Sequence, residues 1–78
     1  MYWKVKSVTP QNDYTLLISF ENGERRLFDM KPYLNIGIFK DLKDLEMFHT
    51  VRVCFSSIAW SNNADMDPEM LYHQSIPV

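Results

Sequence analysis

The part of this chain that comes nearest to a chemical site is a set of three acids at alternate positions: Asp65, Asp67 and Glu69. Calcium loops also place oxygen ligands at alternate positions, with a glycine at position six and a bidentate glutamate at position twelve. A loop starting at Asn63 would have Pro68 at position six and Gln74 at position twelve. Because both demanding positions fail, we predict that no calcium ion binds here.

Acid–base catalysis by this stretch has little support. Paired carboxylates do such work when burial separates their pKa values, whereas Asp65 and Asp67 lie in a polar segment. His49 and His73 have no Ser, Cys or Asp at a recognisable motif spacing. Cys54 is the single cysteine, so with two distant histidines it cannot complete a four-ligand zinc site. We therefore predict that the protein is not an enzyme and needs no metal or other cofactor.

A helix start accounts for most of the acidic stretch. Asp67 is a natural N-cap, Pro68 suits the first helical position, and Glu69 favours the positive end of the helix dipole. A residue before proline is also pushed toward the extended conformation that a cap needs. Asp65 is left over, and we expect it either to bond to the turn at residues 62–64 or to face a partner.

The elements that position these residues begin with the strand pattern of residues 14–20. It predicts one buried face: Tyr14, Leu16, Ile18 and Phe20. Residues 3–9 also alternate and stop at Pro10, which predicts a preceding strand.

Asn22 and Gly23 mark a hairpin whose return strand is residues 25–28. A two-residue turn would set Glu21 opposite Glu24, and like charges facing each other are unfavourable. A three-residue loop with a left-handed Gly23 would set Phe20 opposite Glu24, and we prefer this second register.

Helical signals follow the third strand. Asp29 can cap a short turn that contains Pro32 and ends at Gly37, with Tyr33 and Leu34 pointing inward. A three-residue spacing then predicts a helix over residues 40–48, in one piece or in two with Asp44 as a second cap. The residues of this stripe are Phe39, Leu42, Leu45 and Phe48.

Residues 51–55 and 57–60 predict a second hairpin around Ser56. The expected fold is therefore α+β, with a small antiparallel sheet made of two hairpins and an N-terminal strand. Two or three short helices would pack on this sheet.

Length and composition favour one domain that spans residues 1–78. The chain is 46% hydrophobic and 14% aromatic, and small domains that fold without disulfides are typical of reducing compartments. A net charge of −2 lacks the basic balance of a nucleic-acid binder. No apolar run suits a signal peptide or a membrane helix. We predict a cytoplasmic protein without a membrane partner, and its charge balance disfavours a nucleic-acid partner.

Motifs that span nearly the whole chain carry a family resemblance: Tyr14-x-Leu16-x-Ile18-x-Phe20-x-x-Gly23, Asp29, Phe39-x-x-Leu42, Phe48, Ile58-x-Trp60 and Asp65-x-Asp67-Pro68-Glu69-x-Leu71-Tyr72. With these motifs the chain resembles the bacterial domain-of-unknown-function family 2442. It departs from the family at Ser61, Asn62 and Asn63, where a proline and a glycine are usual. The resemblance implies a small α+β domain without catalytic residues. It also implies a neighbouring small protein, in an arrangement similar to toxin–antitoxin pairs.

Our leading hypothesis is a non-enzymatic protein-interaction module, in its narrowest form the antitoxin-like member of a two-protein pair. The expected partner is another small protein, and a homodimer is also compatible with the sequence. Side chains large enough to anchor an interface are Tyr2, Trp3, Met47, Met70 and Tyr72. We expect most of them to fill the core instead. The candidate interaction residues are Trp60, Asp65 and Tyr72.

Two other functions stay open. A small-ligand or metal-sensing domain would use the stretch from Asp65 to Glu69 together with His73. A nucleic-acid-binding domain would use a basic patch made of Lys4, Lys6, Arg25 and Arg26. Solvated strand faces commonly carry such charges without a partner.

Overall fold

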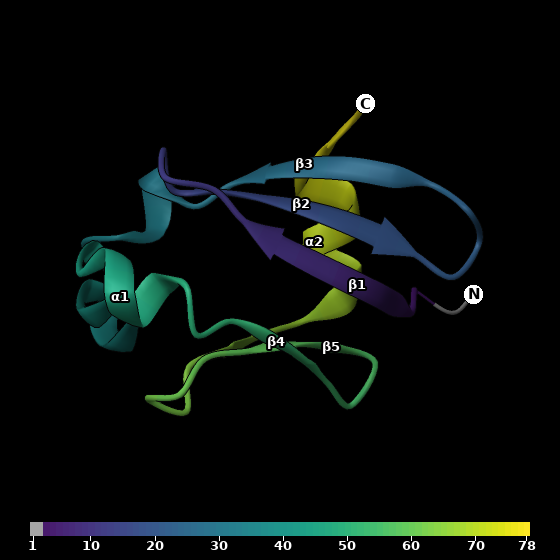
Figure 1. The fold of residues 1–78 in the computed structure, drawn as a ribbon. Coiled ribbons are helices and arrows are strands. Elements are labelled where there is room, and N and C mark those ends of the chain that lie inside the picture. Colours follow the sequence, from purple (N-terminus) through teal and green to yellow (C-terminus); the bar gives the residue numbers. More distant parts are fainter. Residues whose placement is uncertain (1–2) are drawn as a thin grey trace.

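A computed structural model of the chain describes residues 3–78, and its strands form two antiparallel sheets (Figure 1). In chain order the elements are β1 (Val5–Pro10), β2 (Thr15–Phe20), β3 (Arg25–Asp29), the 3-10 helices η1 (Lys31–Tyr33) and η2 (Gly37–Lys43), α1 (Leu45–Phe48), β4 (Arg52–Cys54), β5 (Ser57–Ala59), β6 (Asp65–Met66), α2 (Pro68–Gln74) and β7 (Ile76–Pro77). The first sheet has the order β1-β2-β3-β7 and the second β4-β5-β6. The α+β class is confirmed, and the two predicted hairpins fall in separate sheets.

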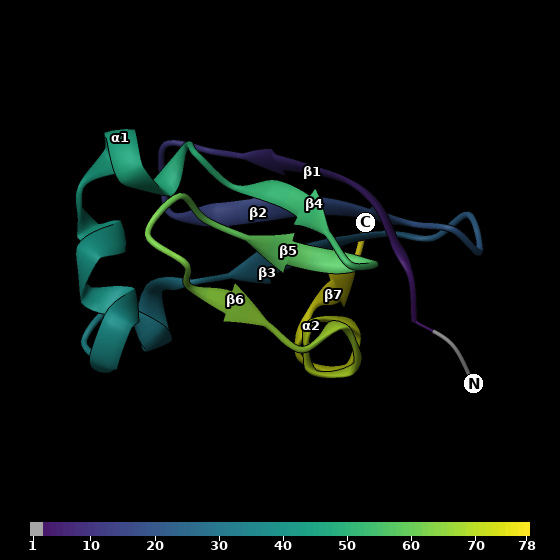
Figure 2. The same ribbon diagram turned by 90° about the horizontal axis from the view of Figure 1, so that it is seen from below.

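The two sheets lie one beneath the other and share a single core (Figures 1 and 2). The segment from η1 to α1 covers one end of the sheets, and α2 runs beside β3 and β6. Trp60, which follows β5, is entirely buried, and its indole N–H donates to the Phe48 carbonyl oxygen at 3.0 Å. This bond ties the second sheet to α1, and burial of large apolar side chains from every layer stabilises the fold.

Three hairpin loops share one backbone design. Each has three residues and ends in a residue with positive φ: Tyr14 (64°), Gly23 (93°) and Asn63 (71°). In the second loop the Phe20 N–H donates to the Glu24 carbonyl oxygen at 2.8 Å, which confirms the preferred register. In the third loop Asn63 takes the left-handed position, which asparagine tolerates well. The departure from the family pattern after Trp60 is therefore accommodated.

The predicted buried face of residues 14–20 is correct for Leu16, Ile18 and Phe20 and wrong for Tyr14, which is half-buried. Tyr14 occupies the left-handed position of its loop, so its side chain leaves the alternation of the strand. Its ring lies 5.4 Å from the ring of Phe48, and its hydroxyl donates to the carbonyl oxygen of Lys43.

The helical segment consists of separate pieces. This confirms the alternative in which Asp44 caps a second piece. Asp44 caps α1 by accepting the Glu46 N–H at 3.1 Å. The prediction that Gly37 ends a turn is wrong, because Gly37 begins η2 with a φ of 49°. Leu45 is 38% exposed and lies outside the core, because the change from 3-10 to α geometry interrupts the three-residue spacing.

Candidate functional site

We call the outward side of β4, β5 and β6, together with the turn at Phe55 and Ser56, the hairpin face. Ile58 and Met66 belong to the core, so the residues that alternate with them lie on the other side of the sheet. Of these, Asp65 is exposed, whereas Ser57 and Ala59 on the central strand are only 7% and 8% exposed. A cavity of about 340 Å³ lies at the hairpin face, and the core residues Ile58 and Met66 contribute to its lining. Its lining includes Arg52, Cys54, Phe55, Ala59, Asn63 and Asp65.

Phe55 stands at the tip of the β4–β5 hairpin, where 98% of its side chain is exposed. Phe55 and Ser56 have φ values of 49° and 65°, as a type I′ turn requires at both central positions. Asn-Gly is the usual pair there, and a left-handed backbone costs about 1–2 kcal/mol for an L-residue. Phe55 buries almost no surface that could offset this cost, so stability does not explain a phenylalanine at this position.

Arg52 and Asp65 lie at opposite edges of the hairpin face. Arg52 is directly opposite Ala59, and Ala59 is directly opposite Asp65, so the three residues form one row across the strands. Directly opposed residues in a sheet are roughly 5 Å apart, which separates Arg52 from Asp65 by about 10 Å. Both are exposed, and neither side chain pairs with another residue of the described chain. The face thus carries one positive and one negative charge around a small central residue.

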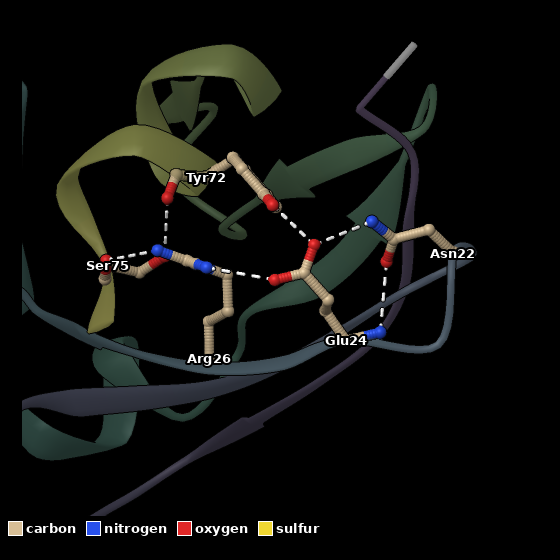
Figure 3. A network of polar contacts seen from close by, with 5 residues as sticks. All are labelled: Asn22, Glu24, Arg26, Tyr72 and Ser75. Atoms are coloured by element: carbon tan, nitrogen blue, oxygen red, sulfur yellow. Dashed lines mark hydrogen bonds and ion pairs between the residues drawn. The ribbon is translucent and has the colours of Figure 1, made fainter. Parts of the chain in front are cut away.

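A second polar cluster joins α2 to the β2–β3 hairpin (Figure 3). The Arg26 guanidinium donates to the Ser75 hydroxyl at 2.9 Å, to the Ser75 carbonyl oxygen at 2.8 Å and to the Glu24 carboxylate at 3.0 Å. Glu24 also accepts from the Tyr72 hydroxyl and from the Asn22 amide. Arg26 lies 4.3 Å from the centre of the Tyr72 ring.

The hydrogen bond from Tyr72 is the main reason that the pKa of the Glu24 carboxyl lies below its usual value. The same bond raises the pKa of the Tyr72 hydroxyl, because the phenol donates to a negative charge. The groups of this cluster satisfy one another within the chain. The arrangement therefore holds α2 in place and leaves little capacity to bind a ligand.

The three candidate interaction residues do not come together. Trp60 is in the core with no exposed surface, so its side chain cannot contact a partner in this fold. Tyr72 is half-buried in the cluster with Arg26, and its ring stacks on Trp3 with 4.0 Å between centroids. Asp65 alone lies on the hairpin face, and the turn bond expected of it is made by Asn62, which accepts the backbone N–H of residue 64 at 3.0 Å.

The other predicted anchors are mainly packing residues. Trp3, Met47 and Met70 are half-buried, and both methionines pack against the core. Tyr2 lies outside the described residues. Arg26 of the predicted basic patch is held by Glu24 and Ser75, so it is not a free phosphate-binding group.

The residues of the acidic stretch have two different roles. Asp67 is the N-cap of α2 and accepts the Glu69 N–H at 3.3 Å, and Pro68 begins the helix, as predicted. Asp65 belongs to β6 and points to the hairpin face. Within residues 3–78, no three or more His, Cys, Asp or Glu side chains form a group that could hold a metal ion. No helix of that range combines the length and apolar character needed to cross a membrane.

Sequence reasoning missed Arg52 and Phe55. The sequence predicts Phe55 at the end of a strand, because an aromatic residue after Val51 and Val53 continues an alternating pattern. The available signal was the pair Phe55-Ser56 between two strand patterns, at the position where a two-residue turn normally has Asn-Gly. Arg52 gave no signal, because its place beside Ala59 and Asp65 depends on strand pairing.

Comparison with known proteins places these features in a family. Searches of curated proteins and of solved structures returned no match. The family model described as "Protein of unknown function (DUF2442)" matches residues 5–77, which is nearly the whole chain and confirms the resemblance. The match includes β1 to β7 and the hairpin face. The chain therefore belongs to the DUF2442 family of proteins of unknown function.

Proposed function

We propose that this domain is a non-enzymatic protein-interaction module and that the hairpin face is its binding surface. The observation that carries the proposal is Phe55, an aromatic side chain that is 98% exposed on a turn with unfavourable backbone geometry. Aromatic residues are enriched at protein interfaces because they bury a large area with few rotatable bonds. Residues whose strained backbone is not offset by contacts within the fold are concentrated at functional sites.

The surroundings of Phe55 support the same function. The cavity of about 340 Å³ lies directly beside it, so a partner's side chain has a recess to fill. Arg52 and Asp65 are exposed at the edges. A central apolar anchor with charged residues at the rim is the usual anatomy of a protein-binding surface.

A narrower form of the proposal makes the chain the antitoxin-like member of a two-protein pair in the cytoplasm. Its support is the family resemblance, and it requires a partner of different sequence. The ligand-sensing alternative has weaker support, because the Asp67 carboxylate is engaged in capping α2.

The test is co-purification from source cells that produce a tagged and an untagged copy of the chain together. We expect the tagged wild-type chain to retain a stoichiometric protein partner, either the untagged copy or a protein of different sequence. Phe55→Ser should lose this partner with an unchanged melting temperature, because Phe55 makes no buried contact in the isolated fold.

The matched control is Ile36→Ser, which removes an exposed apolar side chain near η2, away from the hairpin face. Ile36→Ser should retain the partner. Equal retention by both variants would show that binding does not use the hairpin face.

A further inference from the structure

We infer that the occupant of the hairpin face is a second copy of this chain, and that two copies form a symmetric dimer through it. The inference rests on the proposed function, because it names the partner for the same surface. It is carried by the order of residues across the face and by the position of Phe55.

The row Arg52–Ala59–Asp65 is complementary to itself when reversed. Consider a two-fold axis that lies between two facing copies and runs parallel to β5. Across this axis the strands of the partner follow in the reversed order, so β4 of one copy faces β6 of the other. Each Arg52 then lies opposite the partner's Asp65, and the symmetry makes this ion pair twice. An axis perpendicular to the strands would instead oppose Arg52 to Arg52 and Asp65 to Asp65. Opposite charges favour the first arrangement and like charges disfavour the second.

The same axis accounts for Phe55. A rotation about a line parallel to β5 preserves the direction of the strands, so both hairpin tips lie at the same end of the dimer. The two Phe55 rings then meet beside each other over the cavities. Their contact buries aromatic surface that is exposed in the single chain. Ala59 at the centre of the row is small, which lets the two faces approach closely.

The size of the face sets the strength of the dimer. Three strands of two or three residues offer less than the roughly 800 Å² per partner of a standard interface. We therefore expect a dissociation constant in the micromolar range, with association that weakens as salt screens the two ion pairs.

The test is sedimentation velocity over micromolar to submillimolar concentrations of the full chain. Wild type should shift from monomer to dimer over this range. Arg52→Asp alone and Asp65→Arg alone should each raise the dissociation constant more than about tenfold, because like charges then face each other. An equimolar mixture of these two variants should form heterodimers, because the acids of one then face the arginines of the other.

Two further variants complete the design. The double variant Arg52→Asp/Asp65→Arg should dimerise as the wild type does, because the row is reversed but still self-complementary. The control Lys40→Asp reverses an exposed charge on η2 and should leave the dimer unchanged. Circular dichroism of every variant separates lost association from lost folding.

Two results would overturn the inference. One is a wild-type chain that stays monomeric throughout the range, and the other is a dimer that survives both single charge reversals. The proposed function fails separately, when Phe55→Ser retains every protein partner of the wild type. A chain that is monomeric, yet loses a partner of different sequence on Phe55→Ser, refutes only the dimer.

Discussion

Phe55 and Tyr14 are both aromatic residues with positive φ, and the fold treats them in opposite ways. The ring of Tyr14 packs against Phe48 and its hydroxyl donates to a carbonyl oxygen, so tertiary contacts offset the strain of its backbone. Within residues 3–78, Phe55 has no such compensation. A strained backbone is therefore informative only when the contacts of the side chain are considered with it.

At the residue scale, Glu24→Gln should make the melting temperature fall less steeply as the pH is lowered. The Tyr72 hydroxyl lowers the pKa of Glu24 in the folded state. This contribution to stability is present above the unfolded pKa of glutamate, about 4.3, and is lost as the pH falls through the lowered pKa. The raised pKa of Tyr72 makes stability depend on pH in the opposite direction. Its contribution is complete below the unfolded pKa of tyrosine, about 10, and is lost as the pH rises above it.

Thermal unfolding between about pH 3 and pH 7 measures the acid side of this effect. Glu21→Gln is the control, because Glu21 is exposed in the neighbouring hairpin loop. We expect the acid dependence of Glu21→Gln to match that of the wild type. If Glu24→Gln also matches it, the bond to Tyr72 does not stabilise the docking of α2.

At the element scale, the start of α2 should depend on a cap and not on a charge. Asp67→Ser should be nearly neutral, because serine caps a helix about as well as aspartate. Asp67→Ala should lower the free energy of unfolding by about 0.5–2 kcal/mol. Asp65→Ala is the comparison: it removes an exposed acid two residues earlier and should change stability by less than about 0.5 kcal/mol. Denaturant melts of the three variants measure these differences. An equal loss for Asp67→Ser and Asp67→Ala would mean that the carboxylate itself is needed.

Elements with a strong local signal were predictable from the sequence. The Asp67-Pro68 helix start and the register at Asn22-Gly23 follow from backbone preferences of a few adjacent residues. The strands β6 and β7 have two residues each, too few for a pattern, and they exist because β5 and β3 offer them a hydrogen-bonding edge. The hairpin face could not be predicted for the same reason. Its row joins residues from three strands, and the last of these carries no signal of its own.

At the scale of the whole molecule, Leu16→Ala should destabilise both sheets together. Leu16 is fully buried in the core that the sheets share, and such truncations cost about 2–5 kcal/mol. Far-ultraviolet circular dichroism reports the sheets, and tryptophan fluorescence is sensitive to the surroundings of the buried Trp60. We expect the two signals to change at the same temperature, as the single domain predicted from chain length requires. Two separate transitions would mean that each sheet folds by itself. Leu45→Ala, at a position that is 38% exposed and lies outside the buried core, should lower the transition temperature much less than Leu16→Ala does.

The short strand β7 has a consequence for the solubility of the protein. It forms the outer edge of the four-stranded sheet, and the Val78 N–H donates to the Arg25 carbonyl oxygen at 3.1 Å. Hydrogen-bonding direction alternates along an antiparallel strand, so the nitrogen of Pro77, which lies opposite Arg26, faces away from β3. A proline has no N–H to offer there. The edge that would otherwise recruit strands from other molecules into an aggregate therefore lacks the donor that such growth would need.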